Sequence, residues 1–422
     1  MRETLNQIFF IAFCLMTLPA LVSCKEVTQP KDTQLVLQEI STKSKYNRRA
    51  LENPEDILSW LRELRELEVG QLKNCDLIKY NNLESSLKAR LWTAQAKSHS
   101  DKFSSINYVP VTQLQTLAGY FLLETPSLER LMQIGVAELE SVKSDIRRFE
   151  VELKHKGFIG TLDELATNPK NFITDKNEVE KIYANLIFEA QSNLSSRFYS
   201  YEIPEAKIHI REASNQLTIP AKYSGGNAMI VYLNENGHNI SRAAFISVHE
   251  IFPGHHLSIK ASEKNRLCVG GNPQPLWFGE GWATYTEFVA DQEGFFGAPN
   301  HKLAWFDYRL IRAMRIILDV KRMEGVRDRA GIKEIWNQYM PNRLDDQFEH
   351  ELNRLIKSKH QHILYILGYN SILETKIKLK KNLGSKFDEK KFHDVMMREG
   401  LSTWPDTLYE NMKVAMQMTA DD

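Results

Sequence analysis

Apolar residues recur at helical spacing over residues 128–153, and this long segment limits the fold more than any other feature. The apolar side chains follow one another at steps of three and four residues, which places them on one face of an α-helix. Thr125-Pro126 supplies an N-cap residue and a proline at the first helical position, and Gly157 ends the pattern. We therefore expect a helix of about thirty residues, whose apolar face other helices must cover.

The same helical spacing returns along most of the chain, at residues 54–67, 170–200, 241–262, 279–293, 302–323, 345–370 and 388–399. Two segments, 207–210 and 229–233, instead have the alternating or β-branched pattern of strands. Residues 223–226 are expected to form a loop and residues 234–237 a turn. The predicted fold is mainly α-helical, with a small β-sheet beside the helix that carries the chemistry.

Three histidines and a carboxylate lie within eight positions, as His249-Glu250 and His255-His256. In zinc metallopeptidases, the pattern His-Glu-x-x-His on a helix places two imidazoles one turn apart to hold the metal, and the glutamate is the general base. Here Pro253 occupies the position of the second histidine. On a regular helix His256 would be about 10.5 Å further along the axis than His249, which is too far for both rings to bind one ion at about 2.0–2.1 Å.

The helix cannot be regular, because Pro253 and Gly254 interrupt it. Proline removes a backbone donor and clashes with the preceding turn, and glycine permits backbone conformations closed to other residues. A bulge at this point would draw the next histidine back toward His249, and such bulges are frequent at functional sites. We expect His255 to be the second ligand because it follows the glycine directly, with His256 as the alternative. A third interpretation is that one helix simply ends and another begins, with the histidines solvated or capping.

Residues 249–257 (HEIFPGHHL) and 279–285 (GEGWATY) resemble the bacterial DUF885 family, which contains many predicted lipoproteins and is grouped with the zincin-type metallopeptidases. The resemblance extends from about residue 125 to near the C-terminus. The second segment is also similar to the Asn-Glu-Gly-Phe-Ala-Ser-Tyr segment of gluzincin aminopeptidases, in which the glutamate is the third zinc ligand. Two positions depart from the family, which frequently has a histidine near residues 319–323 and a lysine where this chain has Ile366.

The resemblance implies a zincin-like architecture with one Zn²⁺ ion. The implied ligands are His249, His255 (or His256) and Glu280, and Glu250 is the implied base that deprotonates water on the metal. Bound zinc lowers the pKa of water from 15.7 to about 7, so that hydroxide is available at neutral pH. The predicted reaction is the hydrolysis of a peptide bond.

Other residues are candidates for supporting roles. Tyr365 is the candidate donor to the oxyanion of the reaction, and Gln361 lies four residues earlier on the same helical face and would contact substrate; a packed core tyrosine is the alternative. Glu287 would orient a ligand histidine, or form an exposed salt bridge. The strand at 229–233 would offer its edge to an extended peptide, or be an inner strand. Four aromatic side chains are expected to pack the ligand helix: Trp277, Phe278, Trp282 and Tyr285. Four further histidines are expected to be surface or structural residues: His209, His238, His301 and His350.

Two other functions fit the same residues. Two histidines and a carboxylate also form the facial triad of non-haem iron oxygenases, although Glu250 then has no role. A non-catalytic envelope lipoprotein with a retained metal site is the third hypothesis. Elemental analysis and a peptide digestion screen separate the three.

The first residues resemble a bacterial lipoprotein signal peptide. The apolar run 8–22 is shorter than the ~20 residues needed to span a bilayer, Arg2 precedes it, and a small residue follows it. Residues 21–24 (LVSC) resemble a lipobox, which implies removal of residues 1–23 and a lipid on Cys24 that anchors the chain to a membrane of the cell envelope, facing the periplasm in a Gram-negative cell. An ordinary signal peptide and an uncleaved anchor are the alternatives.

The mature chain is expected to consist of a tether and one domain. Residues 24–50 are rich in Lys, Gln, Ser and Thr and are predicted to be solvated, and residues 51–422 to form a single two-lobed, α-rich catalytic domain of the DUF885 type. Cys75 and Cys268 are the cysteines left for that domain, and the sequence leaves open whether they pair. The 54 Lys and Arg residues balance 54 Asp and Glu residues, so the chain lacks the basic excess that nucleic-acid binding requires, and we expect no nucleic-acid partner.

Overall fold

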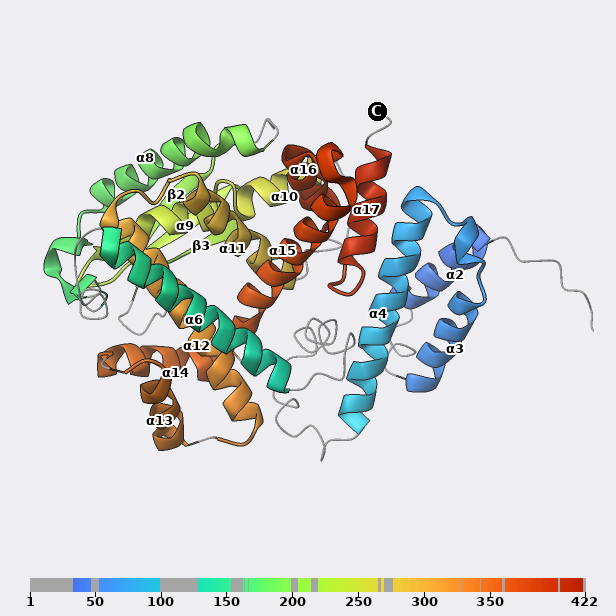
Figure 1. Ribbon diagram of the computed structural model, residues 1–422, viewed down its shortest axis with the longest axis horizontal. Helices are drawn as coiled ribbons and strands as arrows, with labels where there is room; N and C mark the ends of the chain where they lie inside the picture. Colours follow the sequence, from blue (N-terminus) through green and yellow to red (C-terminus); the bar gives the residue numbers. More distant parts are fainter. Residues whose placement is uncertain are drawn as a thin grey trace, which may run out of the picture.

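The fold of the computed structural model is mainly α-helical, with two small sheets (Figure 1). The structure describes residues 33–46, 53–98, 128–152, 162, 164–165, 167–198, 204–213, 219–264, 267–268, 276–326, 328–341, 343–358, 361–400 and 403–419. The predicted signal peptide and Cys24 lie outside these residues. None of the described helices has the length and apolar character needed to cross a membrane.

The helices are α2 (Thr33–Tyr46), α3 (Pro54–Arg65), α4 (Asn74–Ser98), α6 (Leu128–Glu152), α8 (Lys176–Leu194), α9 (Ala243–Glu250), α10 (His255–Lys264), α11 (Leu276–Gln292), α12 (Pro299–Met323), α13 (Arg329–Tyr339), α14 (Asp345–Ser358), α15 (Leu364–Leu383), α16 (Glu389–Glu399) and α17 (Leu408–Met418). The strands are β1 (Phe172–Ile173), β2 (Lys207–Glu212), β3 (Ala221–Gly225), β4 (Ala228–Leu233) and β5 (His238–Asn239).

The N-terminal helices α2, α3 and α4 form a lobe with an apolar cluster of its own (Figure 1, right). Val36, Leu37 and Ile40 of α2 are buried in that cluster, because their spacing places them on one face of the helix. Over residues 33–46 the predicted solvated tether is therefore wrong: this part of the chain is a packed helix. The other boundaries of the predicted domain remain a prediction.

A disulfide and a set of hydrogen bonds attach this lobe to the rest of the protein. Cys75, in α4, is bonded to Cys268 across 193 residues of sequence. The Asn81 side chain of α4 donates to the Asn411 side chain of α17 at 2.8 Å. The pairing that the sequence left open is thus present in the structure.

The long predicted helix is confirmed as α6, which packs along α12 (Figure 1). Gly135 of α6 lies against this neighbour, since a β-carbon there would be 3.0 Å from the Ile317 side chain. The N-cap and stop residues predicted for the helix lie outside the described residues. Together α6 and α12 cover one side of the helices that carry the candidate site.

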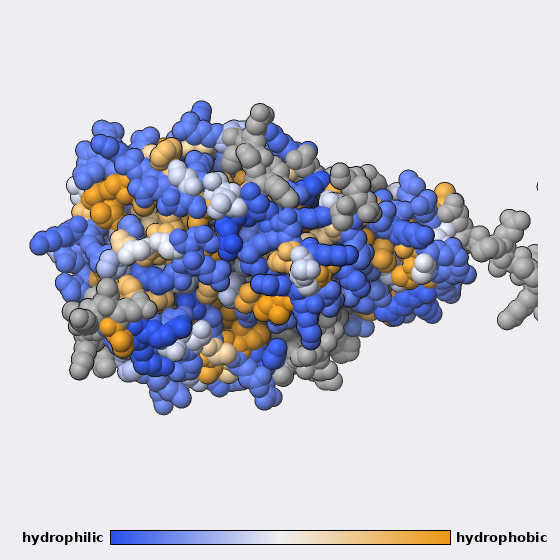
Figure 2. Space-filling view, turned by 45° about the horizontal axis from the view of Figure 1, so that its top comes forward, coloured by the Kyte–Doolittle hydropathy of each residue, from blue (hydrophilic) through white to orange (hydrophobic). Residues whose placement is uncertain are grey.

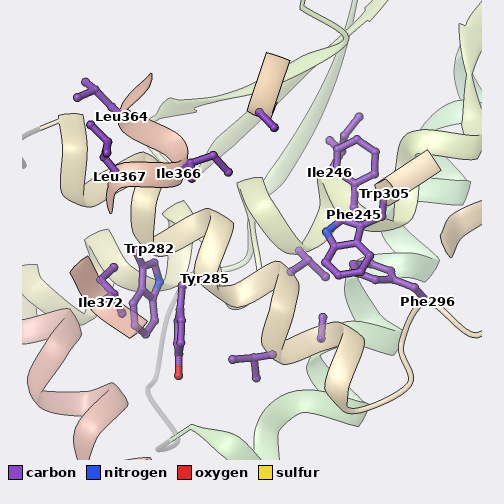
Figure 3. Close-up of a cluster of buried hydrophobic side chains, with 14 of the residues drawn as sticks. Phe245, Ile246, Trp282, Tyr285, Phe296, Trp305, Leu364, Ile366, Leu367 and Ile372 are labelled. Atoms are coloured by element: carbon purple, nitrogen blue, oxygen red, sulfur yellow. The ribbon is translucent and has the colours of Figure 1, made fainter. Parts of the chain in front are cut away.

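Helices α11 and α15 approach each other closely at two glycines. A β-carbon on Gly281 would lie 2.5 Å from the Gly368 backbone, and one on Gly368 would overlap the Trp277 carbonyl oxygen. Figure 3 draws Trp282 of α11 in the same buried cluster as Ile366 of α15. The predicted packing role of the aromatic residues on α11 is confirmed, because all four are at most 2% exposed.

The strand predictions are partly right. β2 and β4 form where predicted, but residues 221–225 are strand β3 rather than a loop, and the three strands lie in the order β2-β4-β3. The edge role considered for residues 229–233 is therefore wrong: β4 is central, parallel to β2 and antiparallel to β3. β1 and β5 form a second sheet that we did not predict.

Two predicted helices are divided, and four of the described helices were missed. The segment 241–262 is split into α9 and α10, and the segment 345–370 into α14, the 3₁₀ turn η7 (Gln361–Ile363) and α15. The helices α2, α4, α13 and α17 were not predicted. The view in Figure 2 shows a mainly hydrophilic surface with apolar patches scattered over it.

Replacing Gly281 by alanine tests the role of the helix crossing. The added methyl group must push α15 away from α11, so we expect a loss of about 1–3 kcal/mol in the free energy of unfolding, measured by denaturant titration. Gly70→Ala is the matched control, because a β-carbon there meets nothing within 4 Å. Equal stability of the two variants would contradict this account of the crossing.

Candidate metal centre

The first ligand helix ends early, and the chain then turns sharply. α9 ends at Glu250 and α10 begins at His255. In the turn between them, the Gly254 amide donates to the Val248 carbonyl at 3.0 Å. A β-carbon at Gly254 would overlap the His249 carbonyl oxygen, so only glycine fits. The proline and glycine therefore interrupt the helix as the sequence predicted, and the break returns the chain toward His249.

Three side chains converge at this turn. The rings of His249 and His255 meet edge to face, with centroids 4.9 Å apart. The Oε2 atom of Glu280, on α11, lies 3.3 Å from His249 Nε2 and 3.6 Å from His255 Nε2. One ligand atom from each of the three residues lies within 4.8 Å of the other two. The structure thus brings together one distant carboxylate and two histidines.

The arrangement fits a metal ion. Four donors at about 2.0–2.1 Å around a tetrahedral zinc ion are about 3.3 Å apart, close to the two distances from Glu280. Glu280 Oε2 is buried and has no hydrogen-bond partner among the residues that the structure describes, although buried polar atoms are nearly always satisfied. A cation between the three side chains would satisfy it, and two nitrogens with one carboxylate oxygen are a ligand set that zinc accepts.

The charges in the group favour a cation as well. Burial acts to lower the pKa of His249, but the neighbouring carboxylates of Glu280 and Glu287 raise it to about 10. Burial acts to raise the pKa of Glu280, yet the two histidines hold it well below its usual range. The carboxylates thus keep the imidazole ring of His249 protonated and positively charged. A bound metal ion would take the place of the proton on this ring.

Glu287 orients His249 from the side opposite the group. His249 Nδ1 lies 2.7 Å from Glu287 Oε1. Glu287 is itself held by two hydrogen bonds from Arg312, at 2.7 and 2.9 Å, and one from Trp305, at 3.1 Å. Burial acts to raise the pKa of Glu287, but Arg312 and His249 lower it to about 2. Glu287 is fully buried, so the alternative of an exposed salt bridge is wrong.

Sequence reasoning missed Arg312 and Trp305. Arg309, Arg312 and Arg315 recur every three residues on α12, and all three are at most 2% exposed. Arginine at helical spacing among apolar residues is a signal of buried ion pairs, since a buried charge needs a partner. That signal was present in the sequence and points to the carboxylates of neighbouring helices.

Glu250 lies beside the group, and His256 lies apart from it. Glu250 Oε2 accepts a hydrogen bond from the Tyr223 amide at 2.6 Å, and burial raises the pKa of Glu250. His256 contacts the Pro204 carbonyl at 2.7 Å and the Tyr223 hydroxyl at 3.0 Å through its two ring nitrogens. His256 is therefore engaged elsewhere, and the structure places His255 in the group.

Tyr365 lies over the ligand histidine. Its ring is nearly parallel to that of His249, with centroids 6.0 Å apart, and the Arg312 guanidinium lies 4.9 Å from its centroid. Burial raises the pKa of Tyr365 well above its usual range, so the hydroxyl keeps its proton. Gln361 begins η7, and its side chain lies outside what the structure describes.

The three converging side chains line a cavity of about 540 Å³. Its walls also include Glu250, Tyr365, the edge strand β3 through Lys222 and Tyr223, and His362, which sequence reasoning did not assign. Among the other histidines, His238 is buried against Tyr183 at 2.8 Å, as a structural residue would be.

Comparison with known proteins identifies the family. The profile described as "Bacterial protein of unknown function (DUF885)" matches residues 115–408. The chain belongs to the DUF885 family. No curated protein matches the sequence.

Two solved structures have a fold similar to that of this chain. One is the putative lipoprotein from Colwellia psychrerythraea, at 17% identity and a TM-score of 0.60, over 91% of this chain and 70% of that one. The other is a putative lipoprotein of unknown function from Shewanella oneidensis, at 16% identity and a TM-score of 0.53, over 94% of this chain and 80% of that one. At such identities the likeness concerns the fold alone.

Substituting Glu287 by glutamine tests its effect on metal binding. The neutral amide orients His249 less firmly, so we expect zinc affinity to fall about 10- to 100-fold, measured by competition with a chromogenic chelator. Glu374→Gln, at an exposed position on α15, is the matched control and should leave affinity unchanged. Unaltered affinity in a folded Glu287→Gln protein would show that the histidine is held by other contacts.

Proposed function

We propose that this DUF885 protein is a zinc-dependent peptide hydrolase of the gluzincin type, with a zincin-like active site. The proposal rests on one observation: two histidines converge with a buried carboxylate oxygen that has no hydrogen bond to any described residue, and a half-buried second carboxylate, that of Glu250, lines the same cavity. His249, His255 and Glu280 are the proposed ligands. A fourth position would remain for water.

Glu250 is the proposed general base. Bound zinc would lower the pKa of water and polarise the scissile carbonyl. Glu250 would take the proton of the attacking water and deliver it to the leaving amine. Burial, which raises the pKa of this carboxyl, suits a group that must accept and then release a proton near neutral pH. The Tyr223 amide holds its side chain in place.

Tyr365 is the proposed donor to the oxygen of the reacting carbonyl. Its protonated hydroxyl belongs to a cavity wall that also contains the ligands, and a fixed donor stabilises charge that develops there. Gln361 is proposed to contact substrate, as a residue of the turn that precedes Tyr365.

A peptide substrate is supported by the open edge of the sheet. β3 pairs with β4 on one side, and Ala221, Lys222 and Tyr223 of β3 line the cavity. An extended peptide can add to such an edge through backbone hydrogen bonds. We infer that the edge role first considered for residues 229–233 belongs to β3.

We also propose that the chain is a lipoprotein of the cell envelope. The lipobox-like segment at Cys24 supports this, as does the description of both similar structures as putative lipoproteins. The lipid on Cys24 would place the hydrolase at a membrane surface, facing the periplasm in a Gram-negative cell.

Cys24→Ser tests the anchor. Because the acceptor thiol is lost, the full chain should leave the membrane fraction, and mass spectrometry should no longer find a lipid-modified N-terminal peptide. Cys14→Ser lies within the same signal segment and should change neither result. A Cys24→Ser protein that remains in the membrane fraction would support the uncleaved-anchor alternative.

Glu250→Gln tests the chemistry. Glutamine keeps the shape of the side chain but cannot take a proton, so we expect zinc content to stay the same and peptide hydrolysis to fall about 10²- to 10⁴-fold. Glu374→Gln serves again as the matched control. The measurements are elemental analysis and a mass-spectrometric digestion screen.

The same measurements separate the rival functions. Undiminished hydrolysis by Glu250→Gln would remove the mechanism. Iron instead of zinc in the purified protein would favour an oxygenase, and bound zinc without any cleavage would favour a non-catalytic lipoprotein.

A further inference from the structure

A second cavity of about 290 Å³ adjoins the metal cavity. Pro220, Tyr308 and Arg354 line both. These side chains therefore form a wall between the two spaces, and one face of that wall belongs to the cavity in which Glu250 and the ligand side chains lie. Neither Tyr308 nor Arg354 has a role in the proposed hydrolysis.

Four arginines surround Tyr308, and we call them the arginine wall: Arg242, Arg312, Arg315 and Arg354. The guanidiniums of Arg312 and Arg315 lie 4.8 and 5.6 Å from the Tyr308 ring centroid. Burial acts to raise the pKa of Tyr308, yet the charges of the arginine wall lower it below its usual value. The guanidiniums therefore make the electrostatic potential at the Tyr308 hydroxyl positive.

Two carboxylates beside the wall, Glu351 and Asp307, each interact with two arginines. Arg315 binds Glu351 through two hydrogen bonds, at 2.6 and 2.9 Å. Burial acts to raise the pKa of Glu351, but the charges of Arg315 and Arg354 bring it to about 2, so one carboxylate serves two guanidiniums. Asp307 is similarly shared, at 2.7 Å from Arg343 and 3.7 Å from Arg242.

A neutral histidine, His362, lies beside the arginine wall on the side of the metal cavity. His362 is 2% exposed and lines the metal cavity. Its Nε2 lies 3.4 Å from the Arg354 carbonyl, and its Nδ1 has no hydrogen-bond partner among the described residues. Burial, together with the charges of Arg315 and Arg354, lowers its pKa to about 3. A side chain that lines the metal cavity thus has one ring nitrogen with no hydrogen bond to any described residue.

We propose that the arginine wall is a specificity subsite that binds a substrate carboxylate, with Arg354 as its main contact and Tyr308 and His362 beside it. The inference deepens the proposed hydrolase function and rests on it, because the substrate must reach the metal group and the wall together. An anion there gains charge-assisted hydrogen bonds, which are stronger than those between neutral groups. The carboxylate is either the C-terminus of a peptide or an acidic side chain near the cleaved bond.

Binding to the zinc-loaded Glu250→Gln protein tests the subsite without turnover. The probes are acetylated tetra-alanine as free acid and as amide, and an amidated peptide of the same length with one glutamate or one glutamine. We expect the free acid, or the glutamate peptide, to bind about 10- to 100-fold more tightly than its neutral partner. The free acid against the amide tests a C-terminal carboxylate, and glutamate against glutamine tests a side chain.

Arg354 variants show where the carboxylate lies. Arg354→Gln should abolish the preference for the free acid over the amide and leave binding of the amide unchanged. Arg354→Lys, which keeps a positive charge, should show part of this preference. Arg148→Gln, on the exposed face of α6, is the matched control. In turnover by the otherwise unchanged enzyme, Arg354→Gln should raise KM for the acidic peptide with little change in kcat. If Arg354→Gln fails to fold, the acid and amide comparison and Arg354→Lys decide the question.

The outcomes for the subsite and for the hydrolase are distinguishable. Equal binding within both pairs, free acid against amide and glutamate against glutamine, overturns the subsite. A preference for the carboxylate that survives Arg354→Gln also overturns it, since the carboxylate then contacts the metal. Neither result affects hydrolysis of neutral peptides. Conversely, selective binding of the acid without any cleavage supports the subsite and overturns the proposed function.

Discussion

The candidate site depends on a buried chain of charges that runs from Arg312 through Glu287 to His249. Each link is a hydrogen bond between groups with almost no exposure, and such a chain is stable only when every member is paired. The arginine fixes the carboxylate, the carboxylate fixes the imidazole ring, and the ring directs Nε2 toward Glu280. Since α12, α11 and α9 each supply one member, their packing sets the geometry of the site.

Close backbone contact allows these helices to act together. The glycines at the crossing of α11 and α15 bring Tyr365 over the ring of His249, and Gly254 lets the chain fold back beside it. The indole of Trp282 then donates to the Pro253 carbonyl at 3.0 Å, which ties the turn to the helix that carries Glu280. Apolar packing and three small residues thus position the polar groups.

Local sequence patterns were sufficient to predict much of the fold and part of the candidate site. The helical periods, two strands, the interruption at Pro253-Gly254 and the preference for His255 over His256 all follow from backbone physics. Glu280 required a family resemblance, because nothing in a sequence specifies how far apart two helices lie in space. For the same reason β3 and the contacts of α2 were missed: their pairing depends on partners elsewhere in the chain, and the polar composition of residues 24–50 concealed three apolar side chains on one face.

α12 relates the metal centre to the arginine wall. Its buried arginines have different partners: Arg309 binds Glu138 and Asp145 of α6, Arg312 binds Glu287, and Arg315 binds Glu351 of α14. One helix therefore joins the scaffold, the ligand histidine and the second cavity. Arg312 donates hydrogen bonds to Glu287, which orients His249, and its guanidinium also lies beside Tyr308. An anion bound at the arginine wall would therefore weaken the electrostatic attraction between Arg312 and Glu287. In the proposed hydrolase, the charge of the substrate and the orientation of His249 would then be coupled through a single guanidinium.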